Sequence, residues 1–279
     1  MKREDFKKCY ELILRQNWLS EKKDKLSNLL ASCTNEDQKN LIIALLEDFH
    51  YINHDILTKL LESAASYIVN DTGFEMEKTQ IVGMANDSNP DSSQWILQLL
   101  RPFLSEKGWN NVKITTNFFQ GVSKLNKEGL TQLVLVDEFI GSGQTVEARI
   151  NHLTSSAKNK YEIKACFMAG MVGGINRVSK SFIDFKCFLP LKKGISDKYL
   201  SPEREKAIRH MSELENYLLQ QINEKKLKNY HLGYNQAEAL YSSYGNTPNS
   251  VFPFFWWPYD VQKELRHPIL TRNEEGLGL

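Results

Sequence analysis

The sequence predicts an α/β protein whose centre is a doubly wound, mostly parallel five-stranded sheet, with a helical layer before it and a helical and aromatic region after it. Two observations favour this class. Short apolar runs alternate with helical patterns through the middle of the chain, which is typical of right-handed βαβ units. One of these runs, residues 133–136, is continuous and apolar, as expected for a strand buried on both faces of a parallel sheet.

The first 75 residues are predicted to form an N-terminal helical region. Apolar residues from Leu41 to Leu61 recur at spacings of three and four, which places them on one helix face. Asn35 is expected to cap a helix, with Glu36 and Asp37 in its first turn, where negative charge is favourable. Nothing in this region indicates chemistry.

Residues 76–195 are predicted to form the core of the protein. Five strands are expected there, over residues 80–85, 112–118, 133–136, 163–171 and 182–190, and helices over residues 94–104 and 146–153. Strands that alternate with helices in this way form a parallel sheet covered on both faces.

The character of the chain changes again over residues 196–279. Residues 202–228 are predicted to form an amphipathic helix. Beyond it, two phenylalanines and two tryptophans stand between Pro253 and Pro258, a composition that is not helical. Exposing so many rings would be costly, so we expect this segment to pack on the main domain or on a partner.

Composition bounds the class of protein. The chain has 279 residues, 41% of them hydrophobic and 25% charged, and a formal net charge of +1. No apolar stretch is long enough to span a bilayer and the N-terminus has no secretory pattern, so we expect a soluble cytoplasmic protein without a membrane partner. The four cysteines form no Cys-x-x-Cys pair, which argues against a zinc site or a disulfide framework.

The residues after the run at 133–136 carry the clearest chemical signal. Asp137 and Glu138 fall at the carboxyl end of the predicted strand, where open α/β sheets bind their ligands. Residues 141–145, Gly-Ser-Gly-Gln-Thr, then lead into a helix, and such a loop can hold a phosphate with backbone N–H groups and hydroxyls. Walker A and Rossmann loops fit this order of residues less well. The alternative is an ordinary βα turn without a ligand.

This segment resembles the phosphoribosyl-diphosphate (PRPP) signature of type I phosphoribosyltransferases. The resemblance implies that Asp137 and Glu138 hold the ribose 2- and 3-hydroxyls and contribute to catalysis. It also implies that the 5-phosphate is bound by Gly141, Ser142, Gly143, Gln144 and Thr145. The expected cofactor is Mg²⁺, which would arrive with PRPP, so that no metal is held by the protein alone.

Two further loops can be placed by the same resemblance. The loop after the first strand offers Ser88, with Ser92 and Ser93, to the diphosphate, although a capping loop without a ligand has the same composition. Residues 120–129 take the position of the mobile catalytic loop of the family, from which Lys124 could close over the diphosphate. The alternative for Lys124 is a solvated surface side chain.

In this family a C-terminal hood covers the base. The resemblance therefore makes Phe254, Phe255 and Trp256 candidates for base stacking and Asn246 a candidate for reading a polar edge. We expect Trp257 to be an internal plug, and the whole aromatic segment could serve as packing instead.

The Asn-Thr-Pro-Asn run followed by Phe-Phe-Trp-Trp resembles a divergent phosphoribosyltransferase-like family of bacterial conflict systems, including retron-type antiphage operons. That resemblance implies an effector acting on nucleotide metabolism. Candidate partners are PRPP or a nucleotide, a second copy of the chain, and a protein, RNA or DNA component of the defence system.

Gly141 separates this chain from purine-salvage members, which carry an aspartate there that assists proton transfer to the base. Hypoxanthine and guanine are therefore disfavoured acceptors. Three hypotheses follow: an active transferase or nucleotide-cleaving enzyme, a PRPP- or nucleotide-sensing module without catalysis, and a structural partner that keeps the fold alone. The acid pair favours the first two, because a structural relic has no use for two carboxylates at a strand end.

Overall fold

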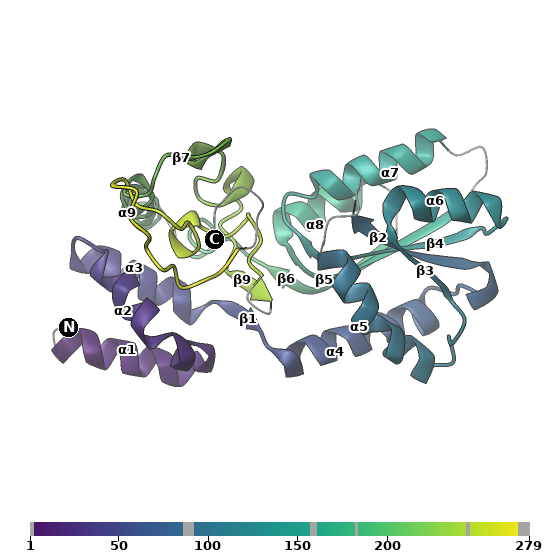
Figure 1. The fold of residues 1–279 in the computed structure, drawn as a ribbon, viewed down its shortest axis with the longest axis horizontal. Helices are drawn as coiled ribbons and strands as arrows, with labels where there is room; N and C mark the ends of the chain where they lie inside the picture. The colour runs from purple at the N-terminus through teal and green to yellow at the C-terminus, as the bar shows by residue number, and fades with distance from the viewer. Residues whose placement is uncertain (1–2, 86–91, 157–160, 182–183, 244–245, 273–279) are drawn as a thin grey trace. The chain divides into compact units, whose positions relative to one another are not determined.

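The chain divides into two compact units (Figure 1). The computed structural model describes residues 3–85, 92–156, 161–181, 184–243 and 246–272. One unit spans residues 54–191, and the other joins residues 1–53 to residues 192–279. The N-terminal and C-terminal segments of the sequence thus share one unit, while the predicted core lies in the other.

The unit of residues 54–191 is built on a five-stranded sheet with the order β3-β2-β4-β5-β6, in which every neighbouring pair is parallel. Its strands are β2 (Thr79–Ala85), β3 (Lys113–Asn117), β4 (Gln132–Ile140), β5 (Glu162–Met171) and β6 (Asp184–Leu191). The predicted fold class is confirmed. Strand β4 is longer than expected and contains the acid pair.

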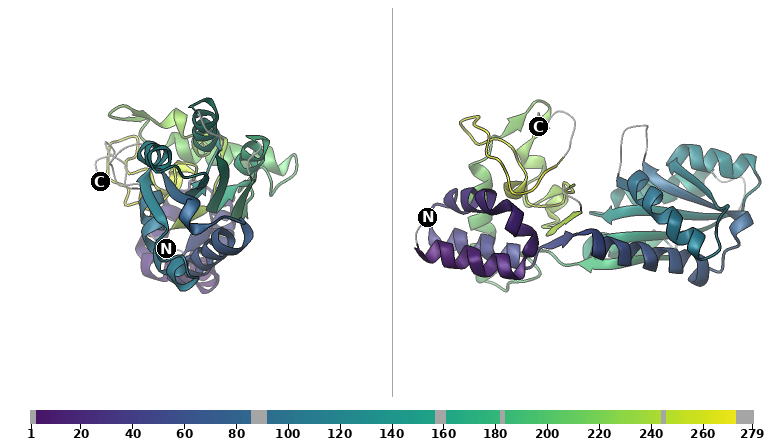
Figure 2. Two further views of the ribbon diagram at one scale, coloured as in Figure 1. Left: turned by 90° about the vertical axis from the view of Figure 1, so that its right-hand side faces the viewer. Right: turned by 60° about the horizontal axis from the view of Figure 1, so that its bottom comes forward.

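Helices cover both faces of this sheet (Figure 2). They are α4 (His54–Ser66), α5 (Ser92–Glu106), α6 (Phe118–Lys127), α7 (Gln144–Ser156) and α8 (Val172–Val178). Helices α4 and α5 lie on one face, and α6, α7 and α8 lie on the other (Figure 1). Helix α4 comes from the region predicted as an N-terminal layer, yet it packs on the sheet because one of its faces is apolar and buried.

Helix α6 replaces the loop predicted at residues 120–129. The side chain of Asn117 caps the helix by accepting a hydrogen bond from the backbone N–H of Gln120 at 3.0 Å. The apolar residues of the helix are spaced by four and three, and those buried against the sheet are Phe118, Val122 and Leu125. Gly121, within the segment predicted as a loop, allows close packing, since a Cβ there would lie 2.6 Å from Cγ2 of Val82.

The second unit combines helices from both ends of the sequence. Its elements are α1 (Arg3–Arg15), α2 (Lys23–Ala31), α3 (Glu36–Glu47), β1 (His50–Ile52), α9 (Glu203–Asn216), β7 (Gln221–Ile222), β8 (Lys225–Lys226) and β9 (Tyr241–Ser243). Asn35 caps α3 as predicted, accepting from the N–H of Gln38 at 2.9 Å. Strand β1, which the sequence did not predict, pairs in parallel with β9, and His50 lies opposite Tyr241.

The helix predicted over residues 202–228 ends at Asn216. A short antiparallel hairpin of β7 and β8 follows, and Asn223 in its turn has a φ of 50°. Asparagine tolerates this left-handed conformation better than most residues. The apolar periodicity alone did not reveal the stop, because Leu218 and Ile222 remain buried in the new conformation.

The aromatic segment forms the core of the second unit. Phe254, Phe255, Trp256 and Trp257 each have an exposed fraction of 0%. The indole N–H of Trp256 donates to the carbonyl of Val251 at 2.9 Å, so burial leaves no indole donor unsatisfied there. Phe255 contacts Phe49 at a ring-centroid distance of 6.2 Å, which ties the C-terminal segment to the N-terminal helices.

Arg266 holds the aromatic segment from the C-terminal side. Its guanidinium donates to the carbonyl oxygens of Trp257 at 3.0 Å and Phe254 at 3.3 Å, and lies 4.9 Å from the centroid of the Phe254 ring. Burial lowers the pKa of Arg266 to about 10. Through these hydrogen bonds the guanidinium satisfies carbonyl groups that the irregular backbone would otherwise leave without a donor inside an apolar core.

Short helical turns complete the structure. They are η1 (Asn17–Lys22), η2 (Tyr67–Asp71, a π-turn), η3 (Met76–Lys78), η4 (Ser179–Ser181), η5 (Leu227–Asn229), η6 (Tyr234–Gln236) and η7 (Pro253–Phe255). Over the described parts of the chain, each helix is too short or too polar to cross a bilayer.

Replacement of Trp256 by alanine should lower the free energy of unfolding by about 3 to 5 kcal/mol, the usual cost of truncating a buried aromatic ring. Chemical denaturation followed by circular dichroism measures this. Tyr10→Ala, in the same unit, is the control, because Tyr10 is 56% exposed and its loss should change stability by about 0.5 kcal/mol or less. Equal effects of the two substitutions would contradict the assignment of Trp256 to the core.

Candidate functional site

The acid pair lies where strand β4 passes the end of its pairing with β2. Strand β4 pairs with β2 as far as Val136, opposite Gly83, and with β5 as far as Ile140, opposite Gly170. When the five strands are numbered by their order in the chain, their order across the sheet is 2-1-3-4-5. Strands β2 and β4 therefore flank its topological switch point. Connections leave this point over opposite faces of the sheet, and the crevice between them is the usual ligand site of open α/β sheets.

The two carboxylates reach this edge from opposite sides. Asp137 is paired with Phe167, whose ring belongs to the apolar core under α6, α7 and α8. Because successive side chains of a strand point to opposite faces, Glu138 is directed to the face of α4 and α5. Asp137 is half-buried and Glu138 is 3% exposed. A ligand that meets both must therefore lie across the end of the strand.

Asp137 is also fixed by the backbone of the next residue. Its Oδ1 accepts a hydrogen bond from the N–H of Glu138 at 2.7 Å. The bond fixes the orientation of the Asp137 side chain within β4.

The predicted phosphate loop connects β4 to α7. Gly143 has a φ of 77°, and its carbonyl accepts the first helical hydrogen bond, from the N–H of Glu147, at 3.0 Å. Gln144 and Thr145 at the start of the helix are exposed, while Gly141 and Ser142 are half-buried. Donors at the N-terminus of a 13-residue helix therefore face the same edge as the acid pair, where an anion is favoured.

Helix α8 lies against the predicted phosphate loop. Glu147 of α7 forms an ion pair with Arg177 of α8, with both Nε and Nη2 of the arginine at 2.8 Å from Oε2. Sequence reasoning did not identify α8, although the Gly173-Gly174 pair, one residue after the strand at 163–171, was a readable signal of close backbone packing.

The structure does not bring Lys124 to the acid pair. Lys124 is exposed in the last turn of α6, and one turn later Glu128 pairs with Lys113, the first residue of β3. This is the amino edge of the sheet, since all its strands run in parallel, whereas Asp137 lies near the carboxyl edge.

The other predicted residues fall into three groups. Ser88 lies outside the described residues, and Ser92 and Ser93 begin helix α5. Phe254, Phe255 and Trp256 pack inside the second unit, and their contact with a base remains a prediction. Asn246 belongs to the same unit, where it is exposed and its backbone pairs with Ser243.

No group of three or more His, Cys, Asp or Glu side chains in the described residues could hold a metal ion. The donors at the β4 edge are two carboxylates, which suit a hard cation but are too few for a complete shell. The residues present fit a Mg²⁺ ion whose other ligands would be phosphate oxygens and water.

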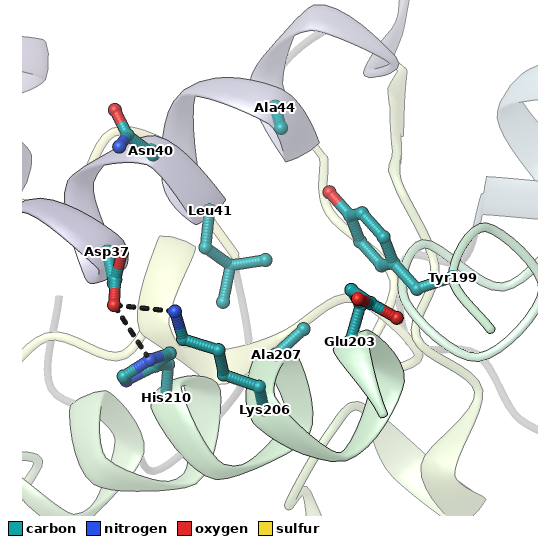
Figure 3. A pocket seen from close by; sticks show the side chains of 9 residues that line it. All are labelled: Asp37, Asn40, Leu41, Ala44, Tyr199, Glu203, Lys206, Ala207 and His210. Carbon is teal, nitrogen blue, oxygen red and sulfur yellow. Dashed lines mark ion pairs between the residues drawn. The ribbon is translucent and has the colours of Figure 1, made fainter. Parts of the chain in front are cut away.

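A pocket in the second unit lies between α3 and α9 (Figure 3). It is lined by Asp37, Asn40, Leu41, Ala44, Tyr199, Glu203, Lys206, Ala207 and His210. Nζ of Lys206 donates to Asp37 at 2.7 Å, which lowers the pKa of that carboxyl, and Nε2 of His210 lies 3.8 Å from the same oxygen (Figure 3). Asp37 of α3 thus faces Lys206 and His210 of α9 across this pocket.

The model of the PRTase-CE family matches residues 18–272, and the chain belongs to this family. The match spans both units and includes the acid pair, the phosphate loop and the aromatic segment. The predicted resemblance to a phosphoribosyltransferase-like family is confirmed. No curated protein matches the sequence.

Solved structures resemble parts of the chain. A hypothetical protein from Neisseria gonorrhoeae with bound ppGpp is 14% identical, with a TM-score of 0.35, over 58% of this chain and 95% of that one. The xanthine-guanine-hypoxanthine phosphoribosyltransferase of Helicobacter pylori is 13% identical, with a TM-score of 0.32, over 51% and 84%. A purine phosphoribosyltransferase from Pyrococcus horikoshii Ot3 is 12% identical, with a TM-score of 0.31, over 51% and 91%.

Gly143→Ala should destabilise the chain more than Gly129→Ala. Both glycines have positive φ, 77° and 67°, a conformation that costs other residues about 1 to 2 kcal/mol. A Cβ at position 143 would also lie 2.8 Å from the carbonyl oxygen of Gly174, whereas one at position 129 would meet nothing within 4 Å. Thermal unfolding of both variants measures the difference, and equal losses would show that the phosphate loop is not closely packed.

Proposed function

We propose that this member of the PRTase-CE family binds PRPP or a nucleoside 5-monophosphate at the carboxyl edge of β4. In this proposal the 5-phosphate lies in the loop of residues 141–145, and the ribose hydroxyls donate to Asp137 and Glu138. The observation that carries the proposal is the conjunction of two carboxylates and a helix N-terminus at the switch point of the sheet.

The chemistry of the two halves of the site supports this ligand. The loop supplies backbone N–H groups and the hydroxyls of Ser142 and Thr145, all of which can donate to phosphate oxygens. The carboxylates accept hydrogen bonds from a vicinal diol. A sugar phosphate carries acceptors at one end and donors in the middle, so its polarity matches the order of groups along residues 137–145.

Mg²⁺ would be held by diphosphate oxygens and water, with Asp137 and Glu138 as the protein groups nearest the ribose. When bound, the ion would neutralise charge on the leaving diphosphate. The protein residues would bind and orient the ribose ring and the phosphate, which keeps C1 fixed relative to the acceptor.

We further propose that the bound PRPP undergoes phosphoribosyl transfer. An acceptor lone pair forms a bond to C1 of the ribose while the bond from C1 to the diphosphate oxygen breaks, and the diphosphate leaves with that electron pair. Positive charge develops on the sugar during this step. The negative charges of Asp137 and Glu138 would stabilise it, since a preorganised charge in a partly buried site acts strongly.

One observation favours a sensor without catalysis as the second candidate. The segment at which the resemblance placed a mobile catalytic loop is helix α6, and Lys124 lies at the amino edge of the sheet. A protein that binds PRPP or a nucleotide and reports its concentration needs the phosphate loop and the acid pair, but it needs no loop that closes over diphosphate.

The proposed biological role is that of an effector acting on nucleotide metabolism in bacterial antiviral defence. Its support is the run Asn-Thr-Pro-Asn followed by Phe-Phe-Trp-Trp at residues 246–257, which resembles proteins of conflict systems. Phage plating on cells that carry the native or a binding-deficient chain tests this role, and equal plating would contradict it.

Thr145→Val should weaken binding of PRPP and of ribose 5-phosphate, because it removes a hydroxyl donor from the phosphate loop. A hydrogen bond to a charged group is worth about 1.5 to 3 kcal/mol, so affinity should fall roughly 10- to 150-fold. Isothermal titration calorimetry with Mg²⁺ measures it. The matched control is Thr154→Val in the same helix, whose hydroxyl bonds to the carbonyls of Ile150 and Asn151 at 3.1 Å. Unchanged affinity in a folded Thr145→Val variant would refute the site.

The double change Asp137→Asn with Glu138→Gln should lower diphosphate release by about a hundredfold or more, since it preserves shape and removes both charges. Asparagine can still accept the hydrogen bond from the N–H of residue 138, so the strand end should remain ordered. A coupled diphosphate assay with purine, pyrimidine and nucleotide acceptors measures the rate. Wild-type protein that binds PRPP but releases no diphosphate with any acceptor would establish the sensor in place of the enzyme.

A further inference from the structure

Helix α8 contacts the phosphate loop through glycine backbone. A Cβ added to Gly174 would lie 2.2 Å from the carbonyl oxygen of Gly141 and 2.9 Å from Cγ2 of Ile140. Real Cβ atoms essentially never approach so closely, and the nearest atom belongs to the backbone rather than to a flexible side chain. Gly174 therefore leaves the space that the first residue of the loop occupies.

The contact is reciprocal. A Cβ on Gly143 would lie 2.8 Å from the carbonyl oxygen of Gly174 and 3.2 Å from Cγ2 of Val178. Next to the loop, where β5 pairs with the last residue of β4, a Cβ on Gly170 would lie 3.0 Å from Cβ of Ile140. Glycines on both sides thus let the two backbones touch from the end of β4 to the start of α7.

An ion pair continues this contact one turn further along the helices. Arg177 follows Gly174 by three residues in α8, and Glu147 follows Gly143 by four residues in α7. Their side chains meet at 2.8 Å with two nitrogen atoms of the guanidinium engaged. The two helices are therefore joined both at the loop and beside it.

We propose that contact with α8 fixes the position of the phosphate loop and that Gly174 is a positioning residue for phosphate binding. This inference rests on the proposed function of the loop. The N–H donors of residues 142–145 bind phosphate well only at hydrogen-bond distance, about 2.7 to 3.2 Å. A side chain at position 174 must push the carbonyl of Gly141 away by roughly 1 Å to reach ordinary van der Waals contact, and a shift of that size breaks such bonds.

The neighbouring glycine provides a matched control. A Cβ on Gly173 would meet nothing within 4 Å, although Gly173 lies in the same helix and in the same turn. Both glycine-to-alanine changes gain the same intrinsic helix propensity. The difference between Gly174→Ala and Gly173→Ala therefore reports the contact with the loop rather than an effect on the helix.

The test combines two measurements on the full chain. Titration with ribose 5-phosphate in the presence of Mg²⁺ should give an affinity within about twofold of wild type for Gly173→Ala and at least tenfold lower for Gly174→Ala. Hydrogen exchange of the amides of residues 142–146, measured without ligand, should be faster in Gly174→Ala and unchanged in Gly173→Ala. If Gly174→Ala does not fold, Arg177→Ala should raise exchange in the same segment.

The two measurements test separately whether α8 fixes the position of the loop and whether the loop binds a phosphate. Wild-type protein that binds none of ribose 5-phosphate, PRPP and nucleoside 5-monophosphates would refute the proposed function, and the exchange data would still decide whether α8 holds the loop. Unchanged exchange over residues 142–146 in the folded Gly174→Ala variant would overturn the proposal that α8 fixes the position of the loop. Faster exchange with unchanged phosphate affinity would overturn the role of Gly174 in positioning.

Discussion

The register of β4 between β2 and β5 is the constraint on which the candidate site depends. Pairing with β2 ends at Val136 and pairing with β5 continues to Ile140, so the acid pair emerges where the winding of the sheet reverses. A slip of one residue would exchange the faces of Asp137 and Glu138 and move an apolar residue to the crevice. The apolar residues of β4 that fix this register are therefore as necessary to the site as the carboxylates themselves.

The second unit depends on a different constraint, the burial of aromatic rings in an irregular segment. A chain without regular hydrogen bonding can enter an apolar core if other groups satisfy its backbone. Arg266 does this for the carbonyls of Phe254 and Trp257. Strands β1 and β9 and the contact of Phe49 with Phe255 then join the two ends of the sequence into one core. Packing is thus the observed role of these rings.

The sequence predicted what depends on local pattern. The five strands and the cap at Asn35 follow from apolar periodicity and side-chain chemistry, and the structure agrees. Asp137 and Glu138 are predicted just after a strand, whereas they lie within β4, which continues beside β5 to Ile140. Helix α6 was not predicted because the resemblance placed a mobile loop at residues 120–129, whereas the tight fit of Gly121 on Val82 is a tertiary contact of a helix packed on the sheet. Helix α9 was extended too far because the apolar residues after Asn216 keep a helical spacing although a hairpin buries them. The grouping of both chain ends into one unit rests on non-local pairing, which no local pattern encodes.

The geometry of the sheet edge also limits what its ligand can be. One end of the candidate site is rigid, since the loop at 141–143 rests on the backbone of α8 and Gly143 leads directly into α7. The carboxylates stand on opposite faces of β4, so a ligand that reaches both must extend across the strand end from the phosphate loop. The proposed ribose 5-phosphate carries a phosphate at one end and hydroxyls beyond it, which matches the order of groups along residues 137–145. In the proposed function, residues 137–145 would select the sugar phosphate and leave the group attached to C1 to other residues, so that the same loop could serve either transfer or sensing.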